Sequence, residues 1–254
     1  MRQINVCGFY PIYIIILLKD RGSTMRSSDA YLVRGFPIFR GVSDTVFESV
    51  TSRSQIRDAS AGEVLLTEGE RPQSLFVLLN GLVETYSNHE DKVVTLSFIR
   101  PPAAFIVAAV WMNQPQLTSA RVTTVSRLLV IPADLVRETI ASDKDFAAAV
   151  GLELAIRYRD VLRELKNQRI RSATERLANW LLVEAAVAGI DEFALEVGRA
   201  LLAARLGMTG EHLSRAFAQL RESGVSIVGN RVRIDRARLE AIARPSVLMD
   251  GTDI

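Results

Sequence analysis

Residues 199–220, RALLAARLGMTGEHLSRAFAQL, predict two short helices joined by a tight turn. The first helix has an apolar stripe in which Ala203 is small, at the point where the two helices must approach closely. Gly207 falls at the turn, where a positive φ costs glycine little. Thr209 can cap the second helix through its hydroxyl group. This pattern is typical of a helix-turn-helix, which lays its second helix in the major groove of DNA.

The second helix has one apolar face and one polar face. Leu213, Phe217 and Leu220 recur at helical spacing and should face the core. The opposite face carries Gly210, Glu211, Ser214, Arg215 and Ala218.

The polar face has the chemistry needed to read bases. Arg215 can donate two hydrogen bonds to guanine, Glu211 can accept one from cytosine N4, and Ser214 can pair with a base or a phosphate. Glu211 and Arg215 are four residues apart, so they can also bond each other. An ordinary helical hairpin with a surface ion pair is the alternative. The turn glycine, small residue, N-cap and polar face occur in one register, and this combination favours DNA binding.

A β-hairpin follows, with alternating runs at 225–228 and 231–234 around Gly229 and Asn230. The region is rich in arginine, at positions 199, 205, 215, 221, 231, 233, 236 and 238, against Glu211, Glu222 and Asp235. A local excess of positive charge suits a phosphate backbone. We therefore expect a winged helix, whose predicted DNA-binding residues are Thr209, Gly210, Glu211, Ser214, Arg215, Arg199, Arg221 and Arg231.

The composition limits the remaining possibilities. The chain has 254 residues, 48% of them hydrophobic, which is enough for two domains. Its single cysteine, Cys7, excludes a disulfide framework and an iron–sulfur cluster held by four thiolates of one chain. This cysteine content fits a reducing, cytoplasmic setting. The net charge of +2 does not reveal the basic region.

Enzymatic signatures are missing from the sequence. The chain has two histidines and no G-x-S-x-G, P-loop, dinucleotide fingerprint or metal-spaced His/Glu cluster. We therefore expect neither an enzyme nor a metal site built from such a cluster.

The first residues contain an apolar run at 9–18, FYPIYIIILL, about half the length that spans a bilayer. Charged residues follow it without a small-x-small cleavage site, so we expect neither a signal peptide nor a membrane helix. The segment is either an extra element packed on the body or sequence upstream of a start at Met25.

Short apolar or alternating runs dominate from residue 30 to about 133. Their ranges are 63–67, 74–79, 82–86, 93–99, 118–125 and 127–131. Regularly spaced short strands predict an antiparallel roll or barrel. Gly62, Gly69 and Gly81 fall where the chain must reverse or kink.

A long helix is predicted next, over residues 143–167. Leu154, Tyr158, Val161 and Leu165 recur at intervals of four and three, which makes them an apolar seam. The seam fits a core helix or a two-fold contact between protomers. A single winged helix binds its short site weakly, which favours the dimer, with recognition helices about 34 Å apart.

A hinge at 170–172 and a separate helix at 173–188 complete the prediction. The predicted divisions are an N-terminal extension (1–29), β-roll effector domain (30–142), dimerisation helix (143–169), winged helix-turn-helix domain (170–245) and tail (246–254).

This order of glycine-cornered roll, long helix and winged helix resembles the Crp/Fnr superfamily of bacterial transcription regulators, over residues 36–243. The resemblance implies an α+β fold, a homodimer on double-stranded DNA, and RNA polymerase as a partner. The E-x-x-S-R set of Glu211, Ser214 and Arg215 is similar to Fnr-type members, which implies a TTG-N-CAA palindrome. Residues 206–217, LGMTGEHLSRAF, look most like the nitrogen-oxide-responsive branch.

The effector segment departs from the family's cyclic-nucleotide binders. Those carry a Gly-Glu pair for the ribose and an Arg-Ser pair for the phosphate. Here Val107 and Ala108 replace Gly-Glu, and Thr118 replaces the arginine beside Ser119. Burying a phosphate without that cation is unfavourable, so the sequence disfavours cyclic AMP. The matching pocket residues are Phe105, Val107, Ala108, Thr118, Ser119, Tyr158, Val161 and Leu162.

An apolar pocket suits haem, a lipid-like effector or no ligand. The resemblance implies a nitric-oxide response through haem, which usually needs a strong axial ligand. His89, in the polar turn SNHED, is the weak candidate ligand, with Met112 and Tyr158 or a terminal amine behind it. His212 belongs to the recognition helix. The alternative function is a sequence-tolerant architectural DNA-binding protein with no effector.

Overall fold

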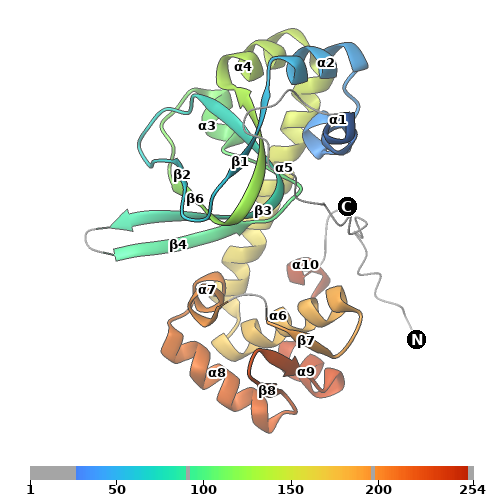
Figure 1. Ribbon diagram of the computed structural model, residues 1–254. Coiled ribbons are helices and arrows are strands. Elements are labelled where there is room, and N and C mark those ends of the chain that lie inside the picture. The colour runs from blue at the N-terminus through green and yellow to red at the C-terminus, as the bar shows by residue number, and fades with distance from the viewer. Residues whose placement is uncertain (1–26, 90–91, 196–197, 251–254) are drawn as a thin grey trace. The chain divides into compact units, whose positions relative to one another are not determined.

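The computed structural model describes residues 27–89, 92–195 and 198–250 (Figure 1). Its contacts divide the chain into two compact units, which meet between Tyr158 and Arg159, inside the long helix α5 (Lys144–Ile170). We call residues 27–158 the roll unit and residues 159–250 the DNA-binding unit, after the folds and the role that the sequence predicts for them. The predicted N-terminal extension lies outside the described residues up to residue 26, so neither interpretation of it is tested.

The roll unit is built on one antiparallel sheet, as predicted. Its strands are β1 (Gln55–Ala59), β2 (Val64–Leu66), β3 (Ser74–His89), β4 (Lys92–Ile99), β5 (Ala103–Phe105) and β6 (Ser119–Pro132). The order is β1-β6-β3-β4, with β2 paired to β6 and β5 paired to β3. Each edge of the sheet therefore consists of two strands, β1 and β2 beside β6, and β4 and β5 beside β3, as in a roll and not in a flat ribbon.

The prediction of separate short strands was wrong at two places. The runs at 74–79 and 82–86 form the single strand β3, and those at 118–125 and 127–131 form β6. Register shifts between Leu78 and Leu82 let the β3–β6 ladder continue through the irregularity.

Gly81 explains why β3 kinks without ending. Its φ is +102°, and a Cβ there would lie 2.7 Å from Cα of Ser126 on β6. The two backbones can approach this closely only because residue 81 has no side chain. Gly62 and Gly69 also have positive φ, at +87° and +84°, but nothing lies within 4 Å of their missing Cβ atoms.

Helices cover one part of the roll. They are α1 (Ser27–Arg34), the 3-10 helix η1 (Pro37–Phe39), α2 (Asp44–Ser52), α3 (Val107–Met112), α4 (Ala133–Ser142) and the first half of α5. Figure 1 shows α1, α2 and α4 gathered together. The core between them and the sheet includes Phe39, packed edge-on against Phe47 at 5.1 Å.

A second apolar cluster lies against the other part of the sheet. In it Phe76 and Phe105 stack at a centroid distance of 5.5 Å, and both rings are buried. The cluster also contains the buried Val83, Val122 and Leu128. These side chains are therefore packed against one another and shielded from solvent.

The DNA-binding unit combines helices with a small sheet. After α5 it contains α6 (Ala173–Ala188), β7 (Glu192–Ala194), α7 (Arg199–Arg205), α8 (Gly210–Glu222), β8 (Ser226–Val228), β9 (Arg231–Arg233), α9 (Arg236–Ala243) and α10 (Val247–Asp250). The sheet order is β7-β9-β8, so the predicted hairpin is present and has gained a third strand. Fully buried Leu177, Leu202 and Phe217 join α6, α7 and α8 in one core.

The helix predictions for this unit hold. Helix α6 has the predicted limits, and α5 extends three residues beyond the predicted end at residue 167. The segment expected to be a tail contains the short helix α10. In the described part of the chain, no helix combines the length and apolar character that crossing a membrane requires.

Candidate nucleic-acid interface

The turn between α7 and α8 has the predicted geometry. Gly207 has a φ of +60°, and the backbone N of Met208 donates to the Ala203 carbonyl at 3.0 Å. Thr209 caps α8, since its hydroxyl oxygen accepts from the backbone N of His212 at 3.2 Å. The sequence therefore fixes where α8 begins and how it leaves the turn.

Helix α8 separates its apolar and polar faces as predicted. Leu213, Phe217 and Leu220 are buried, at 2%, 1% and 0% exposure. Glu211, Ser214 and Arg215 are exposed together with Thr209 and Gly210. The Ser214 hydroxyl donates to the Gly210 carbonyl at 2.9 Å, which leaves its lone pairs for an incoming donor.

The contact between Glu211 and Arg215 that their spacing allows is not formed. Within the described residues, neither side chain has a hydrogen-bond or ion-pair partner. An exposed i, i+4 pair gains only about 0.3–0.5 kcal/mol, too little to hold two long side chains together. Both groups are consequently available to an external ligand.

The remaining predicted DNA-binding arginines differ in their contacts. Arg199 places its guanidinium over the Phe217 ring at 5.5 Å. Arg221 is exposed near the end of α8. Arg231 is also exposed but bonds Glu192 at 3.3 Å, so part of its charge is neutralised in the free protein.

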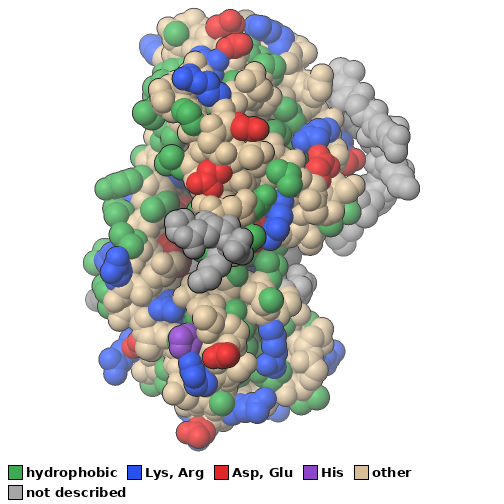
Figure 2. All heavy atoms as spheres, turned by 90° about the vertical axis from the view of Figure 1, so that its left-hand side faces the viewer, with side chains coloured by type: hydrophobic (Ala, Val, Ile, Leu, Met, Phe, Trp, Pro, Cys, Tyr) green, Lys and Arg blue, Asp and Glu red, His purple; other side chains and the backbone are tan. Residues whose placement is uncertain are grey.

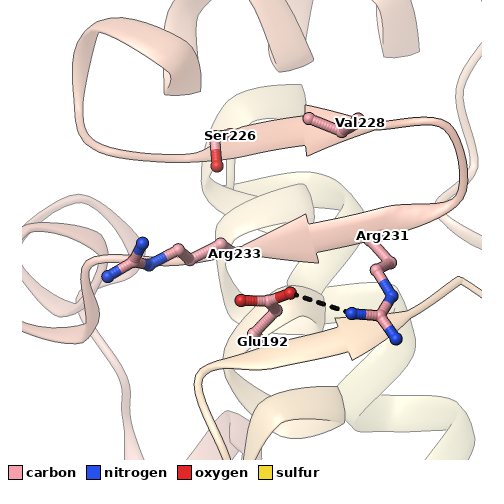
Figure 3. A pocket seen from close by; sticks show the side chains of 5 residues that line it. All are labelled: Glu192, Ser226, Val228, Arg231 and Arg233. Atoms are coloured by element: carbon pink, nitrogen blue, oxygen red, sulfur yellow. Dashed lines mark hydrogen bonds and ion pairs between the residues drawn. The ribbon is translucent and has the colours of Figure 1, made fainter.

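The sheet forms a shallow hollow of about 330 Å³, lined by Glu192, Ser226, Val228, Arg231 and Arg233 (Figure 3). Figure 3 shows Arg231 reaching Glu192, while Arg233 extends the other way. Figure 2 shows more blue Lys and Arg side chains than red Asp and Glu ones on the part of the face that carries α7 and α8. The side chains thus leave an accessible basic surface.

The start of α6 is held by a capping box. The Ser172 hydroxyl accepts from the Glu175 backbone N at 3.2 Å, and the Glu175 carboxylate accepts from the Ser172 backbone N at 2.7 Å. These hydrogen bonds lower the pKa of Glu175 below its usual value. The predicted hinge, residues 170–172, therefore lies at the break between α5 and α6, and Ser172 caps the second helix.

Arg176 was missed by the sequence reasoning. Its guanidinium donates to the carbonyls of Leu206 at 2.9 Å, Gly207 at 3.4 Å and Arg171 at 2.8 Å. It therefore ties the helix-turn-helix turn to the junction between α5 and α6. No local pattern signals this role, because two of the carbonyls are about 30 residues away in sequence.

The predicted seam lies largely exposed on α5. Tyr158, Val161 and Leu165 are 64%, 65% and 48% exposed. Leu154 is half-buried and packs against the core of the roll unit. Three of the four seam residues therefore form an unpaired apolar face on the single chain.

The predicted effector residues fall into two groups. Phe105 is buried in the stack with Phe76, and Val107 is buried at the start of α3. Thr118 is half-buried, and Ala108 is exposed.

The α5 members are all exposed. Tyr158, Val161 and Leu162 are 64%, 65% and 40% exposed. Val161 and Leu162 belong to the DNA-binding unit, beyond the division at Tyr158.

These residues do not fit a cyclic nucleotide. The segment 105–120 contains no lysine or arginine. The hydroxyl oxygen of Ser119, the one matching polar group, accepts from the backbone N of Glu68 at 3.0 Å. Arg121, just beyond, donates to the buried Glu84 carboxylate at 2.6 Å, and this contact raises the pKa of Arg121.

The structure shows the surroundings of some of the candidate haem ligands. Met112 and Tyr158 are 67% and 64% exposed. His89 is the last residue of β3, and its side chain lies outside the described part. His212 is exposed on α8. Across the described residues, no three His, Cys, Asp or Glu side chains group around a common point.

Two domain families match this chain. Residues 56–143 match the cyclic nucleotide-binding domain, and residues 175–242 match the Crp-like helix-turn-helix domain. A "CRP-like cAMP-activated global transcriptional regulator" from Mycobacterium tuberculosis is 26% identical over 215 residues, which cover 82% of this chain and 96% of that protein. A cyclic nucleotide-binding domain followed by a Crp-like helix-turn-helix domain defines a class of transcription regulators. The chain is a regulator of the Crp/Fnr family.

Solved structures agree on the fold. A Crp/Fnr-family regulator from Eubacterium rectale has a TM-score of 0.68 at 19% identity, covering 83% of this chain and 99% of that one. FixK2 from Bradyrhizobium japonicum has a TM-score of 0.64 at 19% identity, covering 76% and 98%. At these identities the likeness shows the shared architecture alone.

Proposed function

We propose that this regulator binds a TTG-N-CAA-like palindrome as a homodimer, using Glu211, Ser214 and Arg215 to read base edges. The observation that carries the proposal is their exposure side by side on α8, with Glu211 and Arg215 lacking partners among the described residues. Arg215 would take guanine O6 and N7, and Glu211 would accept from cytosine N4. Thr209 and Gly210, together with Arg199, Arg221 and Arg231, would contact phosphates.

The homodimer is proposed from the apolar face of α5. Tyr158, Val161 and Leu165 leave large apolar surfaces in water on the single chain. Pairing this face with its copy would bury it and present two recognition helices to one side of the duplex. The family resemblance adds RNA polymerase as the partner at a promoter.

For the effector, we propose an apolar ligand and not cyclic AMP. The segment 105–120 offers no cation for a phosphate, although the Mycobacterium tuberculosis relative is described as cAMP-activated. Haem carrying nitric oxide is the specific version that the resemblance implies. Anaerobic purification followed by an absorption spectrum tests it: a Soret band that shifts with nitric oxide supports haem, and a haem-free protein with full operator affinity rejects it.

An effector-independent architectural role is the second candidate. The observation that favours it is the buried stack of Phe76 and Phe105, in which a predicted effector residue packs against the protein's own core. An architectural protein would bind random DNA nearly as well as any selected site.

Selection from a random DNA pool separates the two candidates. The full-length protein is expected to enrich an inverted repeat with TTG half-sites. Enrichment of a different repeat would reject the proposed readout, and enrichment of none would favour the architectural role.

Sedimentation of the free protein tests the dimer. Val161→Glu should shift the equilibrium toward the monomer, since a charge in an apolar seam lacks a partner.

A further inference from the structure

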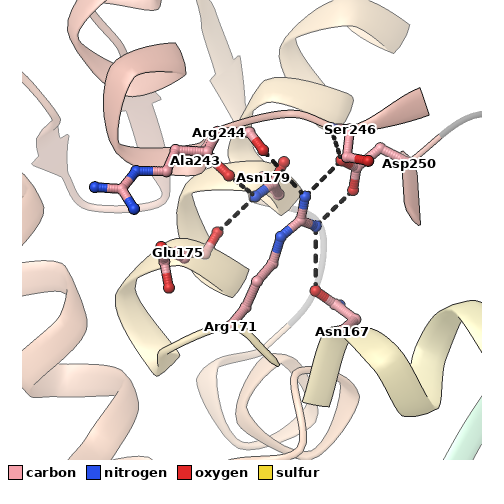
Figure 4. A network of polar contacts seen from close by, with 8 residues as sticks. All are labelled: Asn167, Arg171, Glu175, Asn179, Ala243, Arg244, Ser246 and Asp250. Atoms are coloured by element: carbon pink, nitrogen blue, oxygen red, sulfur yellow. Dashed lines mark hydrogen bonds and ion pairs between the residues drawn. The ribbon is translucent and has the colours of Figure 1, made fainter. Parts of the chain in front are cut away.

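The junction between α5 and α6 contains a buried cation. Arg171 is the first residue after α5, and its side chain is only 4% exposed. A guanidinium leaves water at a large cost unless an anion and further acceptors replace its hydration. Figure 4 shows this side chain surrounded by acceptors from several segments.

Asp250, the last residue of α10, supplies the anion. Its Oδ1 and Oδ2 each accept from a different Nη atom of Arg171, both at 2.6 Å. This bidentate arrangement is the strongest form of the arginine–carboxylate contact. The Asp250 Oδ2 atom also accepts from the backbone N of Ser246 at 2.7 Å, which fixes the carboxylate to the start of its own short helix.

The same guanidinium also bonds α5 and the end of α9. Its Nη1 donates to Asn167 Oδ1 at 3.2 Å, and its Nη2 donates to the Arg244 carbonyl at 3.5 Å. Beside it, the buried Asn179 donates to the Ala243 carbonyl at 2.7 Å. Side chains from α5 and α6 are therefore tied to the C-terminal segment of the described chain.

We propose that Arg171 and Asp250 form a hinge clasp, which fixes the direction in which α5 leaves the DNA-binding unit. Both are positioning residues for operator binding. In a symmetric dimer, the direction of each α5 sets the separation of the two α8 helices. The clasp therefore restricts the dimer to one half-site spacing. The effect on half-site spacing rests on the proposed function, whereas the clasp itself does not.

Four variants of the full-length chain test the clasp. Asp250→Asn removes the anion at nearly constant size, and Asp250→Glu retains it. Asp191→Asn is the matched control, because it breaks an exposed pair in the same unit, Arg236–Asp191 at 2.7 Å. The double variant Arg171→Met/Asp250→Leu replaces the buried pair with apolar groups, a change that stability often tolerates.

Hydrogen exchange provides a readout without DNA. Asp250→Asn should raise the exchange of backbone amides at residues 168–172 by about tenfold at fixed pH, because the junction opens more often. Asp250→Glu and Asp191→Asn should match the wild type. Unchanged exchange in Asp250→Asn would overturn the clasp, even if the wild type selects no palindrome and the proposed function fails.

Spacing selectivity provides the second readout. Affinity is measured for the palindrome selected by the wild type and for the same palindrome with one base pair inserted between its half-sites. A loss of folded protein weakens both affinities equally, so their ratio is insensitive to a merely structural effect. The ratio should fall about tenfold in Asp250→Asn and in the double variant, and a wild-type ratio in either would overturn the proposal.

Discussion

Helix α8 and the interior of the roll in this regulator use their charged side chains in opposite ways. On α8, Glu211 and Arg215 are exposed without partners among the described residues. In the roll, the buried Glu84 is bonded to Arg121 and Thr95, and the buried rings of Phe76 and Phe105 stack on each other. The comparison teaches that one surface of a chain can keep its charged groups available for a ligand while the interior of the roll uses its charged groups for its own fold.

The largest expected effect tests the roll. Gly81→Ala should lower the free energy of unfolding by about 3 kcal/mol, since a methyl group at positive φ would also meet the Ser126 backbone. Gly62→Ala is the control, with a similar φ of +87° and open space around its Cβ. It should cost about 1–2 kcal/mol. Urea denaturation measures both, and equal losses would mean that close strand approach contributes nothing.

The next effect tests the output surface. Arg215→Ala should weaken binding to the selected palindrome by about 2 kcal/mol, roughly 30-fold, and change binding to random DNA little. The control Arg40→Ala removes the same charge from an exposed position in the roll unit. Fluorescence anisotropy measures both affinities at one salt concentration. A parallel loss on both DNAs would show that Arg215 contacts phosphate and not a base.

The third effect tests the capping box at the start of α6. Ser172→Ala should cost about 1 kcal/mol at pH 7, because the Glu175 backbone N loses its acceptor.

The pKa of Glu175 is lowered in the folded state, so its contribution to stability is present above the unfolded pKa and is lost as pH falls through the folded pKa. The Tm difference between wild type and Glu175→Gln should therefore shrink as the pH falls below 4.5, the ordinary pKa of a glutamate. A difference that stays constant down to pH 3 would contradict this linkage.

The smallest effect completes the comparison. Cyclic AMP should leave operator affinity unchanged, because no cation in the segment 105–120 can hold its phosphate. Isothermal calorimetry and the anisotropy titration, repeated with the nucleotide, measure this directly. Saturable binding would show that the roll retains a phosphate site built from other residues.

Local patterns were enough to predict the helix-turn-helix. Gly207, Thr209 and the apolar face of α8 act over one or two helical turns, so the sequence reveals them. The hairpin was also visible, whereas β7 was not, because Glu192–Ala194 is too short to show alternation. In the roll, the bulges that join two runs into β3 depend on the contact between Gly81 and Ser126, 45 residues later in the sequence.

The polar contacts around the hinge were beyond sequence reasoning. Arg171 meets Asp250 across 79 residues, and neither position has a local pattern that marks a partner. In contrast, the pairing of Glu211 with Arg215 was allowed by spacing but does not occur. Spacing says which side chains can meet, and the balance of solvation and side-chain entropy decides whether they do.

The bond between Arg171 and Asp250 sets a rule for building chimaeras from this protein. A graft that ended at Ala243 would keep the recognition helix and the sheet. It would lack Asp250, and Arg171 would be left as a buried cation without a counter-ion. Fusing a foreign sensor therefore requires a transplanted segment that begins before Asn167 and runs through Asp250. The segment that can be transplanted therefore extends further toward the C-terminus than α7, α8 and the sheet alone suggest.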